Sequence, residues 1–317
     1  LLTSHLQITY YTLLIIIVFG IFQLITAIQK KTVKRFLFDS LFLAGAAIIA
    51  VSVNFTNIIT TYDYGKDSTR GKSELTVVGE DEQTGMSKDY ITSWSYGKTE
   101  TLNLLIPNLT GGGSMSELSN DSEMAKELEE LGVRNKRDIL KNMPTYWGDQ
   151  PVTSGPVYIG AVVIFLFILG LLLVKGRLKW WLLTVTVLSI FLAWGKNFMF
   201  FTDLFLDYFP GYDKFRTVSM ILVIAQFSIP LLGILAIKNI TEKKVSKDDV
   251  IKALKWSTGI VAGIILLLLL NPGILSFTSE SDANTFKMMF GLQDDPQSQQ
   301  IMKKFTSALQ ADRASLF

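Results

Sequence analysis

Six long apolar runs constrain this chain more than any other feature of its sequence. An α-helix needs about 20 predominantly apolar residues to cross the hydrocarbon core of a bilayer. Five runs approach that length, and the fourth reaches it only if its helix continues into the aromatic stretch at 198–201. The runs cover residues 8–28, 36–56, 156–174, 180–194, 217–237 and 253–270. We therefore predict an all-α polytopic membrane protein with about six transmembrane helices.

The short loops between these runs predict an orientation. The loops at 29–35 and 175–179 carry lysine and arginine without any acidic residue. The loop at 238–252 carries five lysines and three acidic residues. Short basic loops stay in the cytoplasm, so we expect segments 57–155, 195–216 and 271–317 to lie outside it. The domains are then residues 1–56, residues 57–155, residues 156–270 and the tail 271–317.

The two ends of the chain predict a piece of a longer membrane protein. Leu1 is neither a methionine nor part of a signal-peptide pattern. The orientation above places this end outside the cytoplasm, so we expect a further span upstream. The other end lies in the stretch 296–316, where Ile301, Phe305 and Leu309 recur at helical spacing. This pattern predicts an amphipathic C-terminal helix.

The extracytoplasmic segment 57–155 has a mixed pattern. Its first half predicts short strands at 74–78 and 90–96. The triple glycine at 111–113 lacks the lysine and hydroxyl spacing of a phosphate-binding loop, and we interpret it as a flexible link. A helix follows, capped by Asp121 or Ser122, with Met124, Leu128 and Leu131 on one face. A second short helix runs from Asn135 to Pro144.

The loop at 194–216, WGKNFMFFTDLFLDYFPGYDKFR, packs charges closely among aromatics. Lys196, Lys214 and Arg216 could neutralise a phosphate, and Arg216 offers a bidentate fork. The loop also holds three acidic residues that could bind a metal, act as a base or pair with those cations: Asp203, Asp207 and Asp213. Interfacial anchoring with surface ion pairs is the simpler interpretation of the same residues.

A second cluster, YWGDQPVTSGPVYIG at 146–160, combines aromatic rings with planar polar groups. Sugar-binding surfaces have this composition, and so do helix entries anchored by interfacial aromatics. Tyr212 of the charged loop completes the set of predicted substrate-binding residues. That set is Tyr146, Trp147, Asp149, Gln150, Tyr158 and Tyr212.

The composition argues against a zinc site and against a nucleic-acid partner. The chain has no cysteine and one histidine, so we predict no zinc site. His5 is a weak candidate for a catalytic role, and a divalent cation remains an open possibility as cofactor. The net charge is only +2, which indicates no nucleic-acid partner.

Six motifs together resemble the YfhO-type bacterial membrane proteins, in the long form found in Bacteroidetes. The motifs are HLQITYY at 5–11, SELT at 73–76, SWSYG at 93–97, LLIPN with the following GGGS at 104–114, the cluster at 146–160, and LAWGKNFMFFTDLFLDYFPGYDKFRTVSMILV at 192–223. That family is similar to the GT-C class of membrane glycosyltransferases, which take a sugar from a polyprenyl-phosphate carrier.

The resemblance implies a location, a substrate and part of a site. It implies a multi-pass protein of the bacterial inner membrane, surrounded by lipid, that transfers the sugar to an extracytoplasmic cell-envelope glycan. The GT-C catalytic base lies in the first extracytoplasmic loop, which we expect before Leu1. Lys196, Lys214 and Arg216 match the region where this class often places its phosphate-binding cations.

Glycosyl transfer is therefore the leading hypothesis, and two other classes stay open. A transporter or lipid-carrier flippase would need polar groups along a path through the membrane. The apolar runs contain Gln23, Asn54 and Gln226 but no acid–base pair. A non-catalytic partner in envelope assembly would use the extracytoplasmic segments as docking surfaces.

Overall fold

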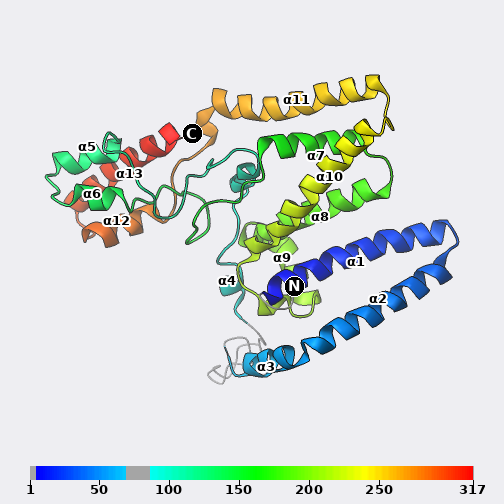
Figure 1. Ribbon diagram of the computed structural model, residues 1–317. Coiled ribbons are helices and arrows are strands. Elements are labelled where there is room, and N and C mark those ends of the chain that lie inside the picture. The colour runs from blue at the N-terminus through cyan, green and yellow to red at the C-terminus, as the bar shows by residue number, and fades with distance from the viewer. Residues whose placement is uncertain (1–4, 69–85, 317) are drawn as a thin grey trace. The chain divides into compact units, whose positions relative to one another are not determined.

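The computed structural model describes residues 5–68 and 86–316, and its described part is helical (Figure 1). No strand occurs among those residues, and the only β-type pairing there is an isolated bridge between Ser116 and Met143. The predicted helical class is confirmed.

Four helices are long and apolar enough to cross a membrane. They are α1 (Leu6–Gln29), α2 (Val33–Val53), the continuous stretch Val218–Thr241 formed by η4 (Val218–Leu222) and α10 (Val223–Thr241), and α11 (Lys247–Leu270). Helix α8 (Arg177–Ala193) and the following segment Gly195–Tyr208 add a fifth span if the two together form one broken span. The angle between them is 112°. The chain is thus consistent with a helical membrane protein, and the count of six stays a prediction.

The third apolar run forms a shorter helix than its sequence predicts. Helix α7 (Ala161–Leu173) has 13 residues, and the predicted start at 156 is wrong. The backbone N–H groups of Ile159 and Gly160 donate instead to the Leu104 carbonyl, at 3.2 and 3.1 Å. Gly160 has a φ of +114°, which a helix does not allow. The residues before α7 are therefore tied to the end of η1 (Thr99–Leu104).

The strand predicted at 90–96 is also wrong, and the one predicted at 74–78 lies outside the described residues. Helix α4 (Lys88–Ile91) occupies the first part, with the Ser87 side chain accepting from the Tyr90 N–H. The hydroxyls of Thr92, Ser93 and Ser95 then donate to carbonyls three or four residues back. Such local bonds compete with strand pairing.

The chain divides into two compact units, each described here by itself. The first unit comprises Leu1–Ser95 and Val174–Leu232, and the second comprises Tyr96–Leu173 and Gly233–Phe317. In the first unit α1 runs antiparallel to α2 and packs against it (Figure 1), and α1 also packs against α8. A bond of 2.7 Å between the hydroxyls of Thr186 and Ser228 joins α8 to α10. Helix α3 (Phe55–Lys66) follows α2 after a break at Asn54.

In the second unit α7 packs along α11, and four further helices share one apolar core. These are α5 (Glu123–Glu130), α6 (Lys136–Leu140), α12 (Asp282–Phe290) and α13 (Pro296–Leu316). The predicted C-terminal helix is confirmed, since Phe305 and Leu309 lie in this core. The predicted α5 is confirmed with its Ser122 cap, but Leu131 follows the helix and is exposed.

Two adjacent residues of α13 connect this core to irregular segments. The Asp312 carboxylate accepts from the N–H groups of Glu123 (2.7 Å) and Met124 (2.9 Å), at the start of α5. Arg313 pairs with Asp282 through two hydrogen bonds of 2.7 and 2.8 Å, and both side chains are buried. The guanidinium also donates to four carbonyls, those of Pro144, Thr145, Tyr146 and Phe277.

We expect Arg313→Met to destabilise the chain by about 3–5 kcal/mol, because it leaves the Asp282 carboxylate buried without its partner. The midpoint of thermal unfolding in detergent measures this. Arg134→Met is the control, because Arg134 is exposed and makes no ion pair within the described residues. Equal midpoints for the two variants would contradict the structural role of Arg313.

Candidate functional site

The charged loop begins at a sharp elbow after α8. It forms η2 (Gly195–Phe198), α9 (Met199–Tyr208) and η3 (Tyr212–Lys214). Gly195 has a φ of +45°, and a Cβ there would lie 2.1 Å from the Ser95 Oγ. Only glycine fits this approach. The Lys196 N–H donates to the same oxygen at 2.8 Å, while its side chain is exposed and makes no ion pair with any described residue.

Arg216 is held by two aromatic residues of the α4 region. Its guanidinium donates to the Tyr90 hydroxyl at 2.7 Å. The guanidinium carbon lies 5.8 Å from the centre of the Tyr90 ring and 5.7 Å from that of Trp94. Both distances fall within the range of cation–π attraction. Arg216 is exposed, and Tyr90 is the only described residue that accepts from its guanidinium. Among the described residues, therefore, no other acceptor uses the remaining N–H groups of this guanidinium.

A buried amide holds the backbone of the same turn. Gln7 of α1 is 5% exposed, and its Nε2 lies 2.7 Å from the Arg216 carbonyl oxygen and 3.3 Å from that of Thr217. Nε2 also donates to the Tyr11 hydroxyl at 2.8 Å. Thr217 has a φ of +64°, a strained conformation for a β-branched residue. The Gln7 bonds help to hold this turn, and with it Arg216, at the start of η4.

The acidic residues of the loop are engaged in ion pairs. Asp213 pairs with its neighbour Lys214 at 2.8 Å. Asp203 and Asp207 instead pair with Lys88 of α4, at 2.5 and 3.9 Å. All these groups are partly exposed. Pairing with cations was one of the predicted roles for these aspartates, but the sequence pattern did not identify Lys88 as a partner.

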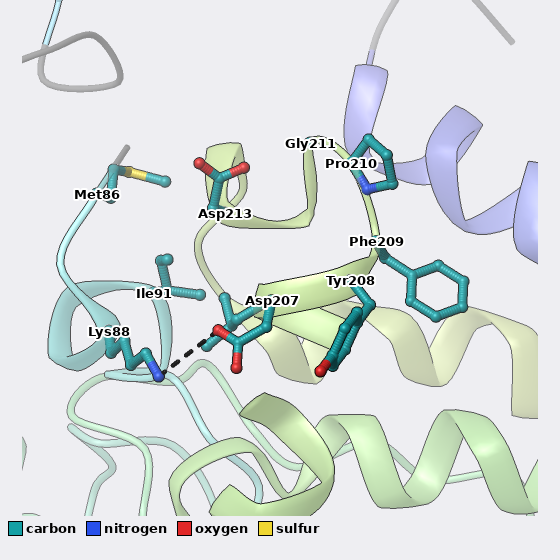
Figure 2. Close-up of a pocket in the computed structure, with 10 residues that line it drawn as sticks. Met86, Lys88, Ile91, Asp207, Tyr208, Phe209, Pro210, Gly211 and Asp213 are labelled. Atoms are coloured by element: carbon teal, nitrogen blue, oxygen red, sulfur yellow. Dashed lines mark ion pairs between the residues drawn. The ribbon is translucent and has the colours of Figure 1, made fainter. Parts of the chain in front are cut away.

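A pocket of about 540 Å³ lies beside these ion pairs. Figure 2 shows Lys88 and Asp207 meeting at this pocket, with Tyr208 beside Asp207. Its polar groups, two carboxylates, a lysine and a phenol, suit hydrogen bonding to several hydroxyls of one ligand. The lining residues are Met86, Lys88, Ile91, Leu206, Asp207, Tyr208, Phe209, Pro210, Gly211 and Asp213.

Two other predicted residues of this unit lie outside the pocket lining. Tyr212 is 2% exposed, and its hydroxyl has no hydrogen-bond partner among the described residues. Its burial raises its pKa far above the usual value of a tyrosine. His5 is exposed just before α1, and its carbonyl accepts from Ile8 and Thr9. Tyr212 supports the loop from within. Its contact with a substrate and the catalytic role of His5 stay predictions.

The second unit contains a buried carboxyl, that of Glu100 in η1, which is 1% exposed. Its Oε1 accepts from the Tyr146 hydroxyl at 2.5 Å. Its Oε2 accepts from the N–H groups of Gly97 (2.6 Å) and Asp149 (3.1 Å). Burial raises the pKa of Glu100 above its ordinary value of 4.5 and outweighs these bonds, and the nearby Asp149 carboxylate acts in the same direction.

The predicted sugar-binding cluster is arranged around Glu100. Tyr146 and Trp147 are 5% and 7% exposed, so they lie beneath the surface. Trp147 packs on Phe277 with a ring separation of 5.5 Å. Of the predicted substrate-binding residues in this cluster, Asp149, Gln150 and Tyr158 reach solvent. The structure therefore brings Tyr146, Asp149 and Gln150 together and leaves their contact with a sugar as a prediction.

The triple glycine lies against this cluster, and the predicted flexible link is wrong. Gly111 has a φ of +84°, and a Cβ there would lie 2.0 Å from the Thr145 carbonyl oxygen. The Gly113 carbonyl accepts from the N–H of Tyr146 (3.3 Å) and from the hydroxyl of Thr145 (3.2 Å). Glycine at 111 is therefore required for the close packing of these two backbone segments.

Sequence reasoning missed Glu100, Lys88 and Gln7. Glu100 is an isolated acid beside the apolar stretch at 102–106, which is a weak signal for a buried carboxyl. Lys88 and Gln7 resemble ordinary polar residues near an interface, because their partners lie more than 100 residues away in the chain.

Within the described residues, no three His, Asp or Glu side chains are grouped closely enough to hold a metal ion. Comparisons of the chain with protein-family models, with curated proteins and with solved structures find no match.

We expect Gly148→Ala to destabilise the second unit by about 1–3 kcal/mol, the usual cost of overpacking. The added Cβ would lie 2.3 Å from the Tyr146 hydroxyl and 2.4 Å from the Glu100 carboxyl carbon. Gly259→Ala in α11 is the matched control, since its Cβ meets nothing within 4 Å. Thermal unfolding of both variants measures the difference, and an equally small effect at both positions would contradict the packing described for Glu100.

We also expect the Glu100 carboxyl to make stability depend on pH. The pKa of Glu100 is higher in the folded state than in the unfolded state, so binding a proton at Glu100 stabilises the folded state. This stabilisation is complete below about pH 4.5, and it is lost as the pH rises through the raised pKa. Glu100→Gln should flatten this part of the stability–pH profile. Unfolding midpoints of the parent and the variant across that range measure it. Identical profiles would show that Glu100 ionises in the folded protein as it does when unfolded.

Proposed function

We propose that this chain is part of a membrane glycosyltransferase of the YfhO type. In this proposal it takes a sugar from a polyprenyl-phosphate carrier and passes it to an extracytoplasmic glycan of the cell envelope. The proposal includes the topology predicted from the basic loops, with six spans in a bacterial inner membrane and segments 57–155, 195–216 and 271–317 outside the cytoplasm.

The main support is the position of Arg216. Arg216 lies two residues before the candidate span Val218–Thr241. Its guanidinium is held by Tyr90 and Trp94. A phosphate on a lipid carrier lies at the membrane surface, at the level where such a span ends. A guanidinium binds phosphate through two parallel hydrogen bonds, and the N–H groups of Arg216 that Tyr90 does not use are suited to this.

Lys196 and the pocket extend this support. Lys196 is exposed at the elbow after α8 and adds a second positive charge for a leaving phosphate. Asp207 and Asp213 provide acceptors for sugar hydroxyls in the pocket, and Tyr208 provides an aromatic ring. In the proposal Arg216 and Lys196 stabilise the phosphate as the glycosidic bond breaks. The base that takes the acceptor's proton is not assigned among the described residues.

The second unit has a separate role in the proposal. Asp149 and the partly exposed Gln150 lie beside the Glu100–Tyr146 pair, and with the exposed Tyr158 they would bind the sugar or the acceptor. The buried pair would position them, because Asp149 donates its N–H to Glu100 and Gln150 donates its N–H to Tyr146.

We expect Arg216→Ala to lower kcat/KM for sugar transfer by about 10- to 100-fold. This range corresponds to about 1.5–3 kcal/mol for a hydrogen bond to a charged group, with 1.4 kcal/mol for each factor of ten. The assay uses the protein together with the upstream loop in which the base is expected, in lipid nanodiscs with a panel of radiolabelled polyprenyl-phosphate hexoses. Tyr90→Phe removes only the hydroxyl that orients the guanidinium, and a smaller loss of about 2- to 10-fold is expected.

Arg134→Ala is the control for this assay, because it removes an exposed arginine of the second unit. Unchanged transfer by a correctly folded Arg216→Ala variant would remove the phosphate role. Absence of transfer by the parent protein with that upstream loop, from every carrier in the panel, would count against the enzyme itself.

A further inference from the structure

Helix α9 exposes a row of large apolar side chains. Phe200, Leu204 and Tyr208 are 86%, 47% and 75% exposed. They are spaced four residues apart, so they share one face of the helix. The opposite side of α9 is buried, with Thr202 and Phe205 at 0% and 5% exposure. The exposed row is therefore a surface of a helix that is already packed on its other side.

The direction of α9 places this row near a membrane surface. Helix α8 and the segment that contains α9 are apolar and long enough for a membrane span only as a pair, and the two are bent by 112°. We take α8, with its 17 residues, as the part that crosses the bilayer. A helix at this angle to a span that crosses the bilayer lies close to the bilayer plane. The bend is surrounded by contacting aromatic rings of Phe191, Trp194 and Phe198. Aromatic residues at the end of a span are typical of the interface between lipid and water.

The charges of α9 are separated from the apolar row. Asp203 and Asp207 form a second row, also four residues apart, on the neighbouring edge of the helix. Lys88 of α4 neutralises this edge through its contacts of 2.5 and 3.9 Å. The row of Phe200, Leu204 and Tyr208 contains no charged side chain. This separation is the pattern of helices that lie in a membrane interface, with the polar edge in water.

We propose that α9 binds the surface of the lipid bilayer through Phe200, Leu204 and Tyr208. The three side chains enter the boundary between headgroups and acyl chains, and the edge formed by Asp203, Asp207 and Lys88 faces the water. The inference does not depend on the proposed enzymatic activity. Tyr208 belongs both to this row and to the pocket lining (Figure 2). The pocket therefore lies at the level of the headgroups, where a lipid-linked ligand presents its polar part.

The absence of cysteine from the chain allows a direct test. Single cysteines are introduced by Phe200→Cys, Leu204→Cys and Tyr208→Cys, with Asp207→Cys as the matched control on the polar edge of the same helix. Each variant of the full chain carries a nitroxide label in nanodiscs of phosphatidylethanolamine and phosphatidylglycerol. Power saturation then compares collisions with oxygen, which concentrates in lipid, and with a water-soluble nickel chelate.

The proposal predicts that the ratio of oxygen to nickel accessibility exceeds one at 200 and 204, is lower at 208, and falls below one at 207. Ratios below one along the whole row would place α9 in water and overturn the proposal. Low accessibility to both reagents would show that protein covers the row, and this would also overturn it. Only variants with the unfolding midpoint of the parent are compared, and two positions still report on the row if one of its three variants fails to fold.

Discussion

In the described part of the chain, backbone groups outside the helices and at helix starts have no strand ladder to pair with, and a few buried side chains supply the partners instead. An unpaired backbone group away from water costs as much as a lost hydrogen bond. Gln7 bonds two carbonyls of the turn at 216–217, and Arg313 bonds four carbonyls in two separate segments. Asp312 and Glu100 each accept from two backbone N–H groups. The irregular segments owe their definite conformations to these contacts.

The same contacts position the groups with possible chemistry. Gln7 holds the turn from which Arg216 projects, and Tyr90 and Trp94 hold its guanidinium. Glu100 and Tyr146 hold the backbone of the exposed Asp149 and Gln150. In each unit a buried polar group supports an exposed one. This arrangement keeps in place a binding group that does not itself belong to a helix, which is what a preorganised site requires.

Helices that depend on a local pattern of apolar residues can be predicted from the sequence. Helix ends and buried groups that depend on partners far away in the chain cannot. Apolar length identified α1, α2, α10 and α11, and helical spacing identified α13 with Phe305 and Leu309 in its core. The start of α7 was wrong because it depends on the Leu104 carbonyl, more than 50 residues earlier. Arg216 was identified from its loop, but Glu100 was not, because a buried carboxyl is recognisable only from the donors around it.

The position of the carrier phosphate is the most direct test of the account. A cryo-electron microscopy map of the full chain in a nanodisc, with polyprenyl phosphate bound, would show it. The account predicts phosphate density in contact with the Arg216 guanidinium, beside Tyr90 and at the end of the span that begins at Val218. Phosphate density elsewhere, with Arg216 still held by Tyr90 and Trp94 and no anion beside it, would contradict the account.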